Sequence, residues 1–293
     1  MKIDYRILWI EDDKSWIRVP KLRIEAKIQE YGFKPIIEPI YDCDLENLKY
    51  SDYDLILVDY KLNCGDDKYG NNILSLLRNR KILSDAIFYS NTNTDILYDK
   101  VKSGKIPNVT IFDRGVFDDD NIDQIYEIIA YYLKKELDLN SMRGIMMAEV
   151  AKFDNELWTI INKLKNKDEI MNYVREKKNN QKAEFDSLSD DDLWKCLNDI
   201  ETSTIHFTSS NRGTYLKKII KSIVENDENS CFKDVLDTTK KYCTEIVDER
   251  NKLAHRETIQ ADDEQKFIAI RKNIIKHQEN FENINNIIKN LQI

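Results

Sequence analysis

Proline and glycine are confined almost entirely to the first part of this 293-residue sequence. All four prolines lie within the first 107 residues, and five of the seven glycines precede residue 116. These residues mark turns between short elements, whereas a long segment without proline favours long helices. A chain of this length is also typical of two domains. We therefore expect two domains of different architecture, residues 1–138 and 139–293, with the boundary near Leu137–Asn140.

Short apolar runs alternate with helical patterns in residues 1–138. The apolar runs are Tyr5–Ile10, Pro35–Ile40, Asp54–Val58, Ala86–Tyr89 and Val109–Phe112. Apolar residues recur at helical spacing in 71–80 and again in 121–136. This alternation predicts an α/β domain with a five-stranded parallel, doubly wound sheet covered by helices on both faces. Ligands of such domains bind outside the carboxyl ends of the strands.

Residues 139–293 have the pattern of helices throughout. The candidate helices are Ser141–Lys165, Lys167–Phe185, Asp190–Thr202, Arg212–Glu225, Ser230–Glu257 and Asp262–Leu291. Ser189 followed by three aspartates is a typical helix start, because acids favour the positive end of the helix dipole. The second domain is therefore expected to be an all-α helical bundle.

The composition excludes several classes of protein. The chain carries 45 basic and 53 acidic residues, a net charge of −8, which argues against a broadly basic nucleic-acid-binding surface but not against a local basic patch. The five cysteines form no C-x-x-C pair, so neither a disulfide framework nor a structural zinc site is expected. No apolar run approaches the roughly 20 residues of a membrane helix, and the N-terminus does not resemble a signal peptide. We expect a cytoplasmic protein without membrane association.

Acidic residues follow two of the expected strands. Glu11, Asp12 and Asp13 come directly after the first strand, Asp59 ends the third, and Ser90 ends the fourth. Carboxylates gathered at one sheet edge repel each other unless a cation lies between them, and Mg²⁺ prefers such oxygen ligands. An aspartate beside Mg²⁺ can also accept a phosphoryl group. The alternative is that these acids only cap helices and turns.

This pattern resembles the receiver domain of bacterial response regulators, over residues 3–136. The resemblance implies that Asp59 is the phosphoacceptor and that Glu11, Asp12 and Asp59 bind Mg²⁺. The backbone carbonyl of Lys61 would be a further ligand, and Ser90 would be the hydroxyl residue that responds to the phosphoryl group. It also implies a histidine kinase or another phosphodonor as partner.

The sequence departs from the receiver pattern at two places. Arg114 stands where the family has a lysine after the fifth strand, so we expect Arg114 to be the second switch residue beside Ser90. Arginine binds anions in a bidentate manner and does not simply replace lysine. The loop at 62–70 is also longer and more acidic than usual. A receiver that never gains a phosphoryl group therefore remains an alternative.

Of the three histidines, His206 and His277 are expected to be structural or solvent-exposed, whereas His255 closes the run Arg250-Asn-Lys-Leu-Ala-His. On a continuous helix with about 100° per residue, Arg250 lies near the centre of the apolar stripe. A guanidinium there needs an internal carboxylate or an anionic ligand, because it cannot lose its charge. The internal candidates are Glu149, Glu156 and Glu201.

The run resembles the R-x4-H motif of HEPN (higher eukaryote and prokaryote nucleotide-binding) domains, over residues 141–293. Many HEPN proteins are all-helical endoribonucleases that need no metal, which implies an RNA substrate and no cofactor at this site. Arg250 would then stabilise the charge on the phosphate, Asn251 would position the sugar or phosphate, and His255 would transfer protons.

Arg250 and His255 lie five positions apart, about 140° around an ideal helix, so one straight helix does not aim both side chains at one phosphate. Pairing of two copies would bring them together. We therefore predict a homodimer and a receiver-regulated, metal-independent endoribonuclease, with a role in bacterial stress response or phage defence by family analogy alone.

Two other functions are considered. One is a non-catalytic signalling adaptor whose helical domain binds a protein or RNA partner. The other is a DNA-binding regulator, which is disfavoured by the 25 basic and 27 acidic residues of 139–293 and by the lack of a short helix-turn-helix spacing.

Overall fold

The computed structural model of the protein describes residues 3–41, 53–63, 69–91, 93–113, 122–177, 188–199, 205, 207–227, 230–256, 258, 260 and 262–291. The chain divides into two compact units, Lys2–Leu137 and Asp138–Ile293. We refer to them as the α/β unit and the helical unit. No helix in the described ranges combines the length and the apolar character needed to cross a membrane.

The α/β unit contains one parallel sheet, whose strand order is β2-β1-β3-β4-β5. The strands are β1 (Asp4–Ile10), β2 (Lys34–Ile40), β3 (Leu55–Asp59), β4 (Asp85–Ser90) and β5 (Val109–Asp113). In the register of the sheet, Ile7 lies opposite Ile37 on one side and Leu55 on the other. This order is one of the two common doubly wound orders, and its topological switch point lies between β1 and β3. The predicted fold class is confirmed.

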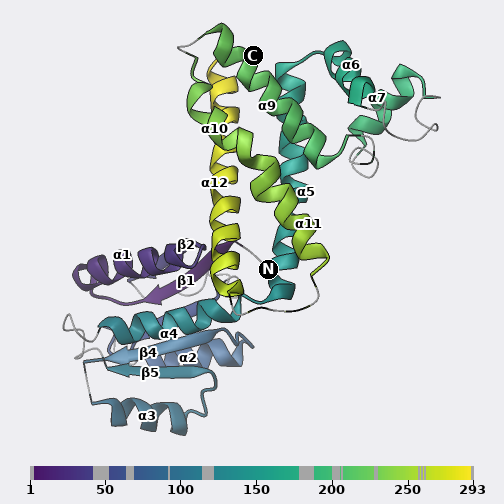
Figure 1. Cartoon of the computed structure of the whole chain (residues 1–293). Coiled ribbons are helices and arrows are strands. Elements are labelled where there is room, and N and C mark those ends of the chain that lie inside the picture. The colour runs from purple at the N-terminus through teal and green to yellow at the C-terminus, as the bar shows by residue number, and fades with distance from the viewer. Residues whose placement is uncertain are drawn as a thin grey trace. The chain divides into compact units, whose positions relative to one another are not determined.

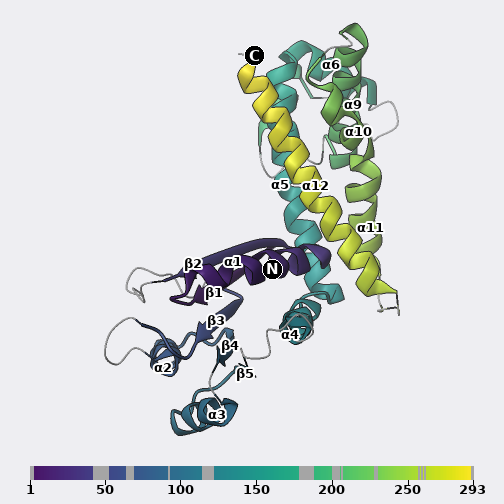
Figure 2. The same ribbon diagram turned by 90° about the vertical axis from the view of Figure 1, so that its left-hand side faces the viewer.

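Helices cover both faces of this sheet (Figures 1 and 2). They are α1 (Lys14–Glu30), α2 (Gly70–Asn79), α3 (Thr94–Ser103) and α4 (Ile122–Lys135). Leu8 and Ile10 of β1 belong to one buried core with apolar residues of α2 and α3. Alternate strand residues point to opposite faces, so Trp9 faces α1, where its ring lies 5.8 Å from that of Trp16. The strands are apolar because both faces are buried.

The helical unit contains no strand among its described residues. Its helices are α5 (Leu139–Leu164), α6 (Lys167–Lys177), α7 (Asp190–Asn198), α9 (Ser209–Asn226), α10 (Lys233–Tyr242), α11 (Asp248–Ala254) and α12 (Asp263–Asn290). The long helices α5 and α12 run side by side, and α9 and α10 pack beside them (Figures 1 and 2). The rings of Phe153, Tyr242 and Phe281 meet in the core, with centroids 5.3 to 6.0 Å apart. The expected helix start at Ser189 is confirmed, since its side chain accepts a hydrogen bond from the Asp192 amide.

The segment expected as one helix over Ser230–Glu257 is not a continuous α-helix. A π-helical turn, η4 (Cys243–Val247), joins α10 to α11. Because a π turn holds more residues than an α turn, side-chain directions after it cannot be counted at 100° per residue. Arg250 is half-buried and lies three positions from each of the buried residues Val247 and Leu253, but the π turn before it changes the spacing on which the predicted placement was based. From Tyr242 to Ala254, the buried residues are Tyr242, Ile246, Val247 and Leu253.

Candidate functional site

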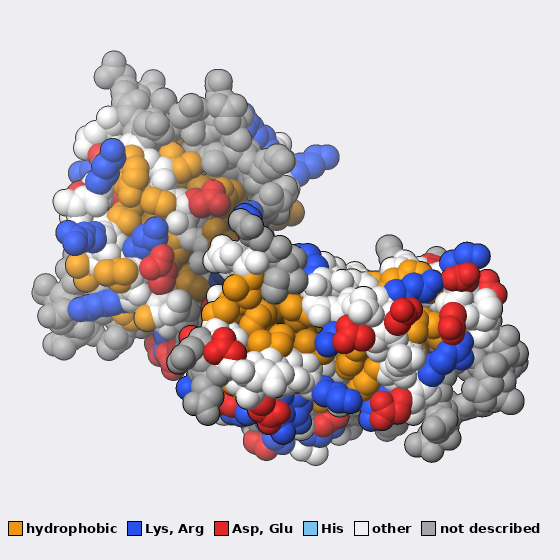
Figure 3. Space-filling view, turned by 90° about the horizontal axis from the view of Figure 1, so that it is seen from above, with side chains coloured by type: hydrophobic (Ala, Val, Ile, Leu, Met, Phe, Trp, Pro, Cys, Tyr) orange, Lys and Arg blue, Asp and Glu red, His pale blue; other side chains and the backbone are white. Residues whose placement is uncertain are grey.

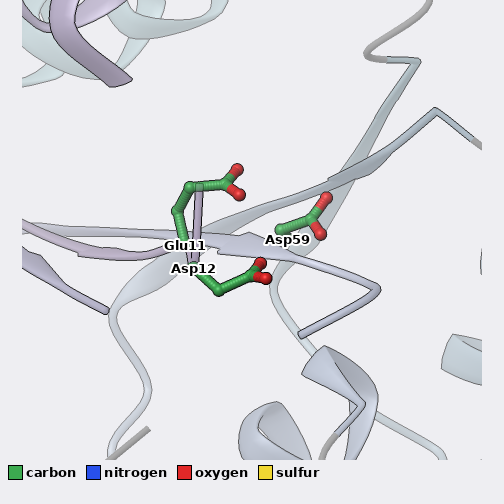
Figure 4. A group of neighbouring side chains, drawn as sticks. All are labelled: Glu11, Asp12 and Asp59. Carbon is green, nitrogen blue, oxygen red and sulfur yellow. The ribbon is translucent and has the colours of Figure 1, made fainter. Parts of the chain in front are cut away.

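Three carboxylates gather at the carboxyl ends of the neighbouring strands β1 and β3. Glu11 and Asp12 directly follow β1, and Asp59 is the last residue of β3. One oxygen from each side chain lies within 4.8 Å of the others. Figure 4 shows the three carboxylates around one common space. The structure thus places these three predicted ligands together at the switch point of the sheet.

Hydrogen bonds hold two of these acids in place. Glu11 is fully buried and Asp59 is 3% exposed. Glu11 accepts hydrogen bonds from the Asp13 amide at 3.1 Å and from the Tyr89 hydroxyl at 2.9 Å. Asp59 Oδ2 accepts one from the Lys61 amide at 3.0 Å. Burial and the neighbouring Glu11 carboxylate raise the pKa of Tyr89 well above its ordinary value, so the hydroxyl keeps its proton.

Asp12 is half-buried and is held from the loop that follows β3. Its Oδ2 accepts hydrogen bonds from the Asn63 side-chain amide at 2.6 Å and from the Asn63 backbone amide at 3.3 Å. The sequence offered no sign of this role for Asn63, because the two residues are 51 positions apart.

Asp13 has a different role from the two acids before it. It is the N-cap of α1, and its Oδ1 accepts hydrogen bonds from the amides of Ser15 and Trp16 at 3.0 and 3.1 Å. The capping explanation therefore holds for Asp13. Glu11 and Asp12 cap no helix among the described residues, and their carboxylates belong to the cluster.

Two other residues of the predicted site, Ser90 and Lys61, are described by the structure and lie at the same edge of the sheet. Ser90 is the last residue of β4 and is buried, and the preceding Tyr89 pairs with Asp59 in the register. Lys61 is exposed and forms an isolated bridge with Tyr69. Arg114 lies outside the described residues.

Gly70 closes the loop after Asp59 and was not singled out in the sequence. Its amide donates to the Tyr60 carbonyl at 2.9 Å. A Cβ atom at this position would lie 2.1 Å from the Asp59 carbonyl oxygen, so only glycine allows the start of α2 to approach the end of β3 so closely. The signal available in the sequence was a glycine between a loop and an apolar helical pattern.

The donor set of the cluster is made of carboxylate oxygens, two of them on buried side chains. A hard divalent cation such as Mg²⁺ prefers ligands of this kind. Three carboxylates this close also repel each other, and a bound cation offsets that repulsion. Glu11, Asp12 and Asp59 therefore fit the predicted Mg²⁺ ligands by chemistry and by spacing.

The helical unit holds a second polar site, a cavity of about 570 Å³ beside α5. Arg250 and Asn251 of α11 line it, as do Asp154 and the start of α9. The remaining lining residues are Met147, Val150, Ala151, Asn155, Thr208, Ser209, Ser210 and Val247. Thr208 is the N-cap of α9, so the positive end of that helix borders the cavity.

Asp154 is the acid among the described residues that line this cavity. It is 6% exposed, and its Oδ2 accepts a hydrogen bond from the Ser209 hydroxyl at 2.7 Å. Burial raises the pKa of Asp154, while the Ser209 bond and the charges of Arg212 and Arg250 oppose that rise. Arg212 is buried and donates to the carbonyls of Phe207 and Asp154, each at 2.8 Å.

Two atoms of this network are buried without a hydrogen-bond partner in the described part of the chain, Asp154 Oδ1 and Arg212 Nη2. Such atoms are costly unless a water molecule or a ligand satisfies them. Asp154 lines the same cavity as Arg250, and neither Glu149 nor Glu156 is among the described residues that line it. Of these two predicted partners, Glu149 is bound by Lys152 at 2.6 Å and by Gln278 at 2.7 Å, and Glu156 is exposed. Glu201 lies outside the described residues.

The structure separates the three residues of the R-x4-H run. Arg250 donates through Nε to the Asn251 side chain at 3.1 Å, and both border the cavity. His255 is the C-cap of α11, is exposed, and is not a lining residue of that cavity. Within one chain the motif therefore supplies an arginine and an asparagine to one site and a histidine to the surface.

His277 is fully buried, in contrast to its polar surroundings in the sequence. Its Nε2 lies 3.0 Å from Glu245 Oε2 in η4, and Lys276 donates to the same carboxylate at 3.1 Å. The structural role expected for His277 fits this placement. His206 lies outside the described residues.

Positive and negative side chains are interspersed over the described surface in Figure 3, with apolar side chains between them. That face shows no broad field of one sign in the residues that are described. The distribution agrees with the net charge of −8.

No family model matches the sequence, and no curated protein matches it. Among solved structures, the chain is similar to the response regulator DrrB of Thermotoga maritima, an OmpR/PhoB homologue, with 15% identity and a TM-score of 0.33. That match covers 45% of this chain and 54% of DrrB, so the matched region is about half the length of DrrB.

Two isolated receiver domains are also similar to the chain. The receiver domain of Francisella response regulator 1452 is 21% identical with a TM-score of 0.32, and the CheY-like receiver domain protein of Methanospirillum hungatei is 18% identical with a TM-score of 0.34. Each match covers 45% of this chain and 98% of the other. The fold of the α/β unit is defined by its own strand order and register.

Proposed function

We propose that the α/β unit is a Mg²⁺-dependent phosphoryl switch of the receiver type, with Asp59 as the acceptor. The observation that supports it is the cluster of Glu11, Asp12 and Asp59 within 4.8 Å at the switch point of a doubly wound sheet. Ser90 ends the neighbouring strand β4 at the same edge, where a hydroxyl can bind a phosphoryl oxygen.

The reaction is a transfer from a small acyl phosphate or a phosphohistidine. A carboxylate oxygen of Asp59 attacks the phosphorus, the bond from phosphorus to the donor oxygen or nitrogen breaks, and an aspartyl phosphate and the free donor result. Bound Mg²⁺ would supply neutralisation of the negative charge at the site. The Lys61 amide holds Asp59 in position, and the buried Glu11 and half-buried Asp12 supply the oxygen ligands beside it.

Phosphoryl incorporation tests this proposal directly. The full chain is incubated with acetyl phosphate and Mg²⁺ and its intact mass is measured. We expect one added phosphoryl group in the wild type, none in Asp59→Asn, and none with EDTA. Asp13→Asn is the matched control, because it removes a neighbouring charge but keeps an N-cap residue, and it should be modified like the wild type. Equal incorporation in Asp59→Asn would contradict the proposal.

For the helical unit we propose RNA cleavage without a metal ion. The observation that favours it is the cavity in which half-buried Arg250, Asn251 and the start of α9 converge, since these groups bind phosphate.

In the proposed reaction the RNA 2′-hydroxyl attacks the adjacent phosphorus and the 5′-oxygen leaves, which yields a 2′,3′-cyclic phosphate and a 5′-hydroxyl. Arg250 stabilises the charge on the phosphate, and Asn251 positions it. His255 takes the proton from the 2′-hydroxyl or returns one to the 5′-oxygen. Because His255 does not line the cavity of its own chain, the proposal requires a homodimer in which the partner's copy of the residue completes the site.

Mixing of variants tests the composite site. Purified protein is incubated with total RNA and EDTA, with and without acetyl phosphate pretreatment in Mg²⁺. Wild-type cleavage should disappear in Arg250→Ala and in His255→Ala, and should persist in the control Lys266→Ala, which removes an exposed charge of α12. Mixed and re-associated, the two inactive variants should regain activity, since one of the two sites in a heterodimer is then intact.

The signalling adaptor is the competing function for the helical unit. A lack of cleavage under every condition, with normal phosphoryl incorporation at Asp59, would favour an adaptor that binds a protein or RNA partner. Under that outcome the proposal for the α/β unit stands and the proposal for RNA cleavage fails.

A further inference from the structure

A chain of buried hydrogen bonds reaches the acid cluster from inside the α/β unit. The Trp9 indole donates through Nε1 to the Tyr89 hydroxyl at 2.6 Å, and that hydroxyl donates to Glu11 Oε2 at 2.9 Å. All three side chains are fully buried. Trp9 belongs to β1, Tyr89 to β4, and Glu11 follows β1 directly, so the chain runs along one face of the sheet.

The Trp9 indole determines which group donates in each of these hydrogen bonds. An indole N–H can only donate, so the Tyr89 oxygen must accept and its own proton must point to Glu11. The other Glu11 oxygen accepts from the Asp13 amide at 3.1 Å. Asp13 is itself held as the N-cap of α1. Both oxygens of the carboxylate are therefore oriented by groups with a defined donor direction.

The three hydrogen-bonded side chains Trp9, Tyr89 and Glu11 are shielded from water. The Trp16 ring packs against both aromatic members, with its centroid 5.8 Å from that of Trp9 and 5.5 Å from that of Tyr89. A hydrogen bond in such an apolar environment is stronger than one in water, and no solvent molecule can readily replace a lost donor. The Tyr89 hydroxyl is therefore the buried donor that, together with the Asp13 amide, orients the Glu11 carboxylate.

We propose that Tyr89 and Trp9 are positioning residues for the cation site, and that they set its affinity by holding the Glu11 carboxylate toward the space it shares with Asp12 and Asp59. The inference rests on the proposed Mg²⁺ site. Without the Tyr89 hydroxyl, Glu11 would keep the bond from the Asp13 amide, but its carboxylate would be less firmly oriented and would have to be ordered when a cation binds. Groups that orient a metal ligand typically change metal affinity by about 10- to 100-fold when they are removed.

Calorimetric titration of the full chain with Mg²⁺ alone tests this role. Tyr89→Phe removes only the hydroxyl and should weaken Mg²⁺ binding by about 10-fold. Trp9→Phe leaves Tyr89 able to donate and should weaken binding by a smaller factor, about threefold. The matched control is Tyr5→Phe, the same change near the start of β1 at a site 3% exposed, where the ring packs 5.7 Å from Phe33. It should bind Mg²⁺ like the wild type.

A double-variant cycle separates positioning from a general effect on the fold. In a Glu11→Gln background the Tyr89→Phe change should alter Mg²⁺ affinity by less than about twofold, because the carboxylate that it orients is absent. An equal loss in both backgrounds would show that Tyr89 acts only through the fold, and would overturn the proposal.

The outcomes distinguish this proposal from the one on which it rests. Wild-type affinity in Tyr89→Phe, with clear binding by the wild type, overturns the positioning role and leaves the cation site intact. Absence of Mg²⁺ binding by the wild type overturns both.

Discussion

The two sites of this protein are assembled in different ways. In the α/β unit, the acids follow directly on strand ends, and parallel pairing alone brings Glu11, Asp12 and Asp59 within 4.8 Å. In the helical unit, the cavity draws Asp154 from α5, Ser209 from α9 and Arg250 from α11. The first arrangement depends on parallel pairing of strands, which the sequence pattern predicted, and on a strand order that the structure supplied. The second arrangement depends on how helices rotate and pack.

Each site nevertheless contains a buried acid held by residues far away in the sequence. Glu11 receives its hydrogen bond from Tyr89, 78 positions away, and Asp154 receives its bond from Ser209, 55 positions away. The difference is the charge of the surroundings. The charges of Arg212 and Arg250 act on Asp154, whereas the Glu11 site gathers three carboxylates, which suit the proposed cation. Removal of a residue that contacts Asp154 should therefore destabilise the helical unit. Removal of a residue that contacts Glu11 should mainly weaken cation binding by the α/β unit.

The largest effect is expected from Arg212→Met in the helical unit. This change removes the buried guanidinium that donates to the Phe207 and Asp154 carbonyls, and leaves Arg250 as the remaining arginine charge that acts on the buried Asp154. Loss of a buried charged partner typically costs about 3–5 kcal/mol. Hydrogen exchange of the full chain, resolved by unit, should show the loss only within Asp138–Ile293. Lys217→Met, on the exposed side of α9, is the control and should change little. A loss shared equally by both units would contradict the comparison.

Gly70→Ala is the corresponding change in the α/β unit. The new Cβ would lie 2.1 Å from the Asp59 carbonyl oxygen, so the start of α2 must shift, at a cost of about 1–3 kcal/mol. Because Asp59 moves with it, Mg²⁺ affinity should fall as well. Gly104→Ala, whose Cβ would meet its nearest atom at 3.1 Å, should cost less and leave Mg²⁺ binding unchanged. Calorimetry and urea unfolding measure both effects, and unaltered Mg²⁺ binding in Gly70→Ala would disprove the coupling.

Acid should weaken the helical unit before the α/β unit, because the buried His277 lies in the helical unit. Burial lowers the pKa of His277 below its ordinary 6.5, although Glu245 opposes that shift. At a pH between the pKa of His277 in the folded chain and its pKa in the unfolded chain, the unfolded chain binds more protons than the folded chain. The free energy of unfolding therefore falls as the pH drops below 6.5. Each unit by which the pKa is lowered corresponds to about 1.4 kcal/mol.

Urea unfolding between pH 8 and pH 5 checks this expectation. His277→Gln keeps a hydrogen-bonding group but cannot titrate there, and it should flatten the dependence in the helical unit. The pKa of Glu245 is lowered: burial opposes the shift, but the hydrogen bonds from Lys276 and His277 outweigh it. The stabilisation that Glu245 contributes is therefore lost only as the pH falls below 4.5, the ordinary pKa of a glutamate. An unchanged pH profile in His277→Gln would refute the assignment to His277.

The smallest and most similar effects are expected at the two helix caps. Asp13→Ala in α1 and Ser189→Ala in α7 each remove a side chain that accepts from a backbone amide in the first turn. Each should cost about 1 kcal/mol, measured by urea unfolding of the unit concerned. Asp13→Asn keeps the cap and should lose less. A much larger cost at Asp13 would show that it also supports the acid cluster.

Much of the α/β site could be predicted from the sequence. The polar residues of this site come directly after apolar runs, which predicts that they lie at strand ends. Because ligands of such sheets bind outside the carboxyl ends of the parallel strands, this position also predicts that they share one site. The residues are Glu11, Asp12, Asp59 and Ser90. The roles of Asn63 and Gly70 could not be predicted in this way. They depend on how closely the loop after β3 approaches the sheet, and no local pattern encodes that distance.

Less of the helical site could be predicted. Helical spacing indicated the helices and the Arg250–His255 run, but the angular position of Arg250 was calculated for a regular helix that η4 interrupts. The π turn has no periodic signature and persists because tertiary contacts, among them the Glu245–His277 pair, hold it. The choice of Asp154 over Glu149 as the acid near Arg250 likewise depends on which face of α5 packs against α9.

By itself the sequence determined the two-part architecture, the parallel sheet and the acids at its edge, because hydrophobic period and turn residues act locally along the chain. Only the tertiary structure decided which buried donors orient Glu11, which acid lies beside Arg250, and where His255 points. Those outcomes depend on hydrogen bonds and packing between residues tens of positions apart, and such contacts exist only after the elements have docked.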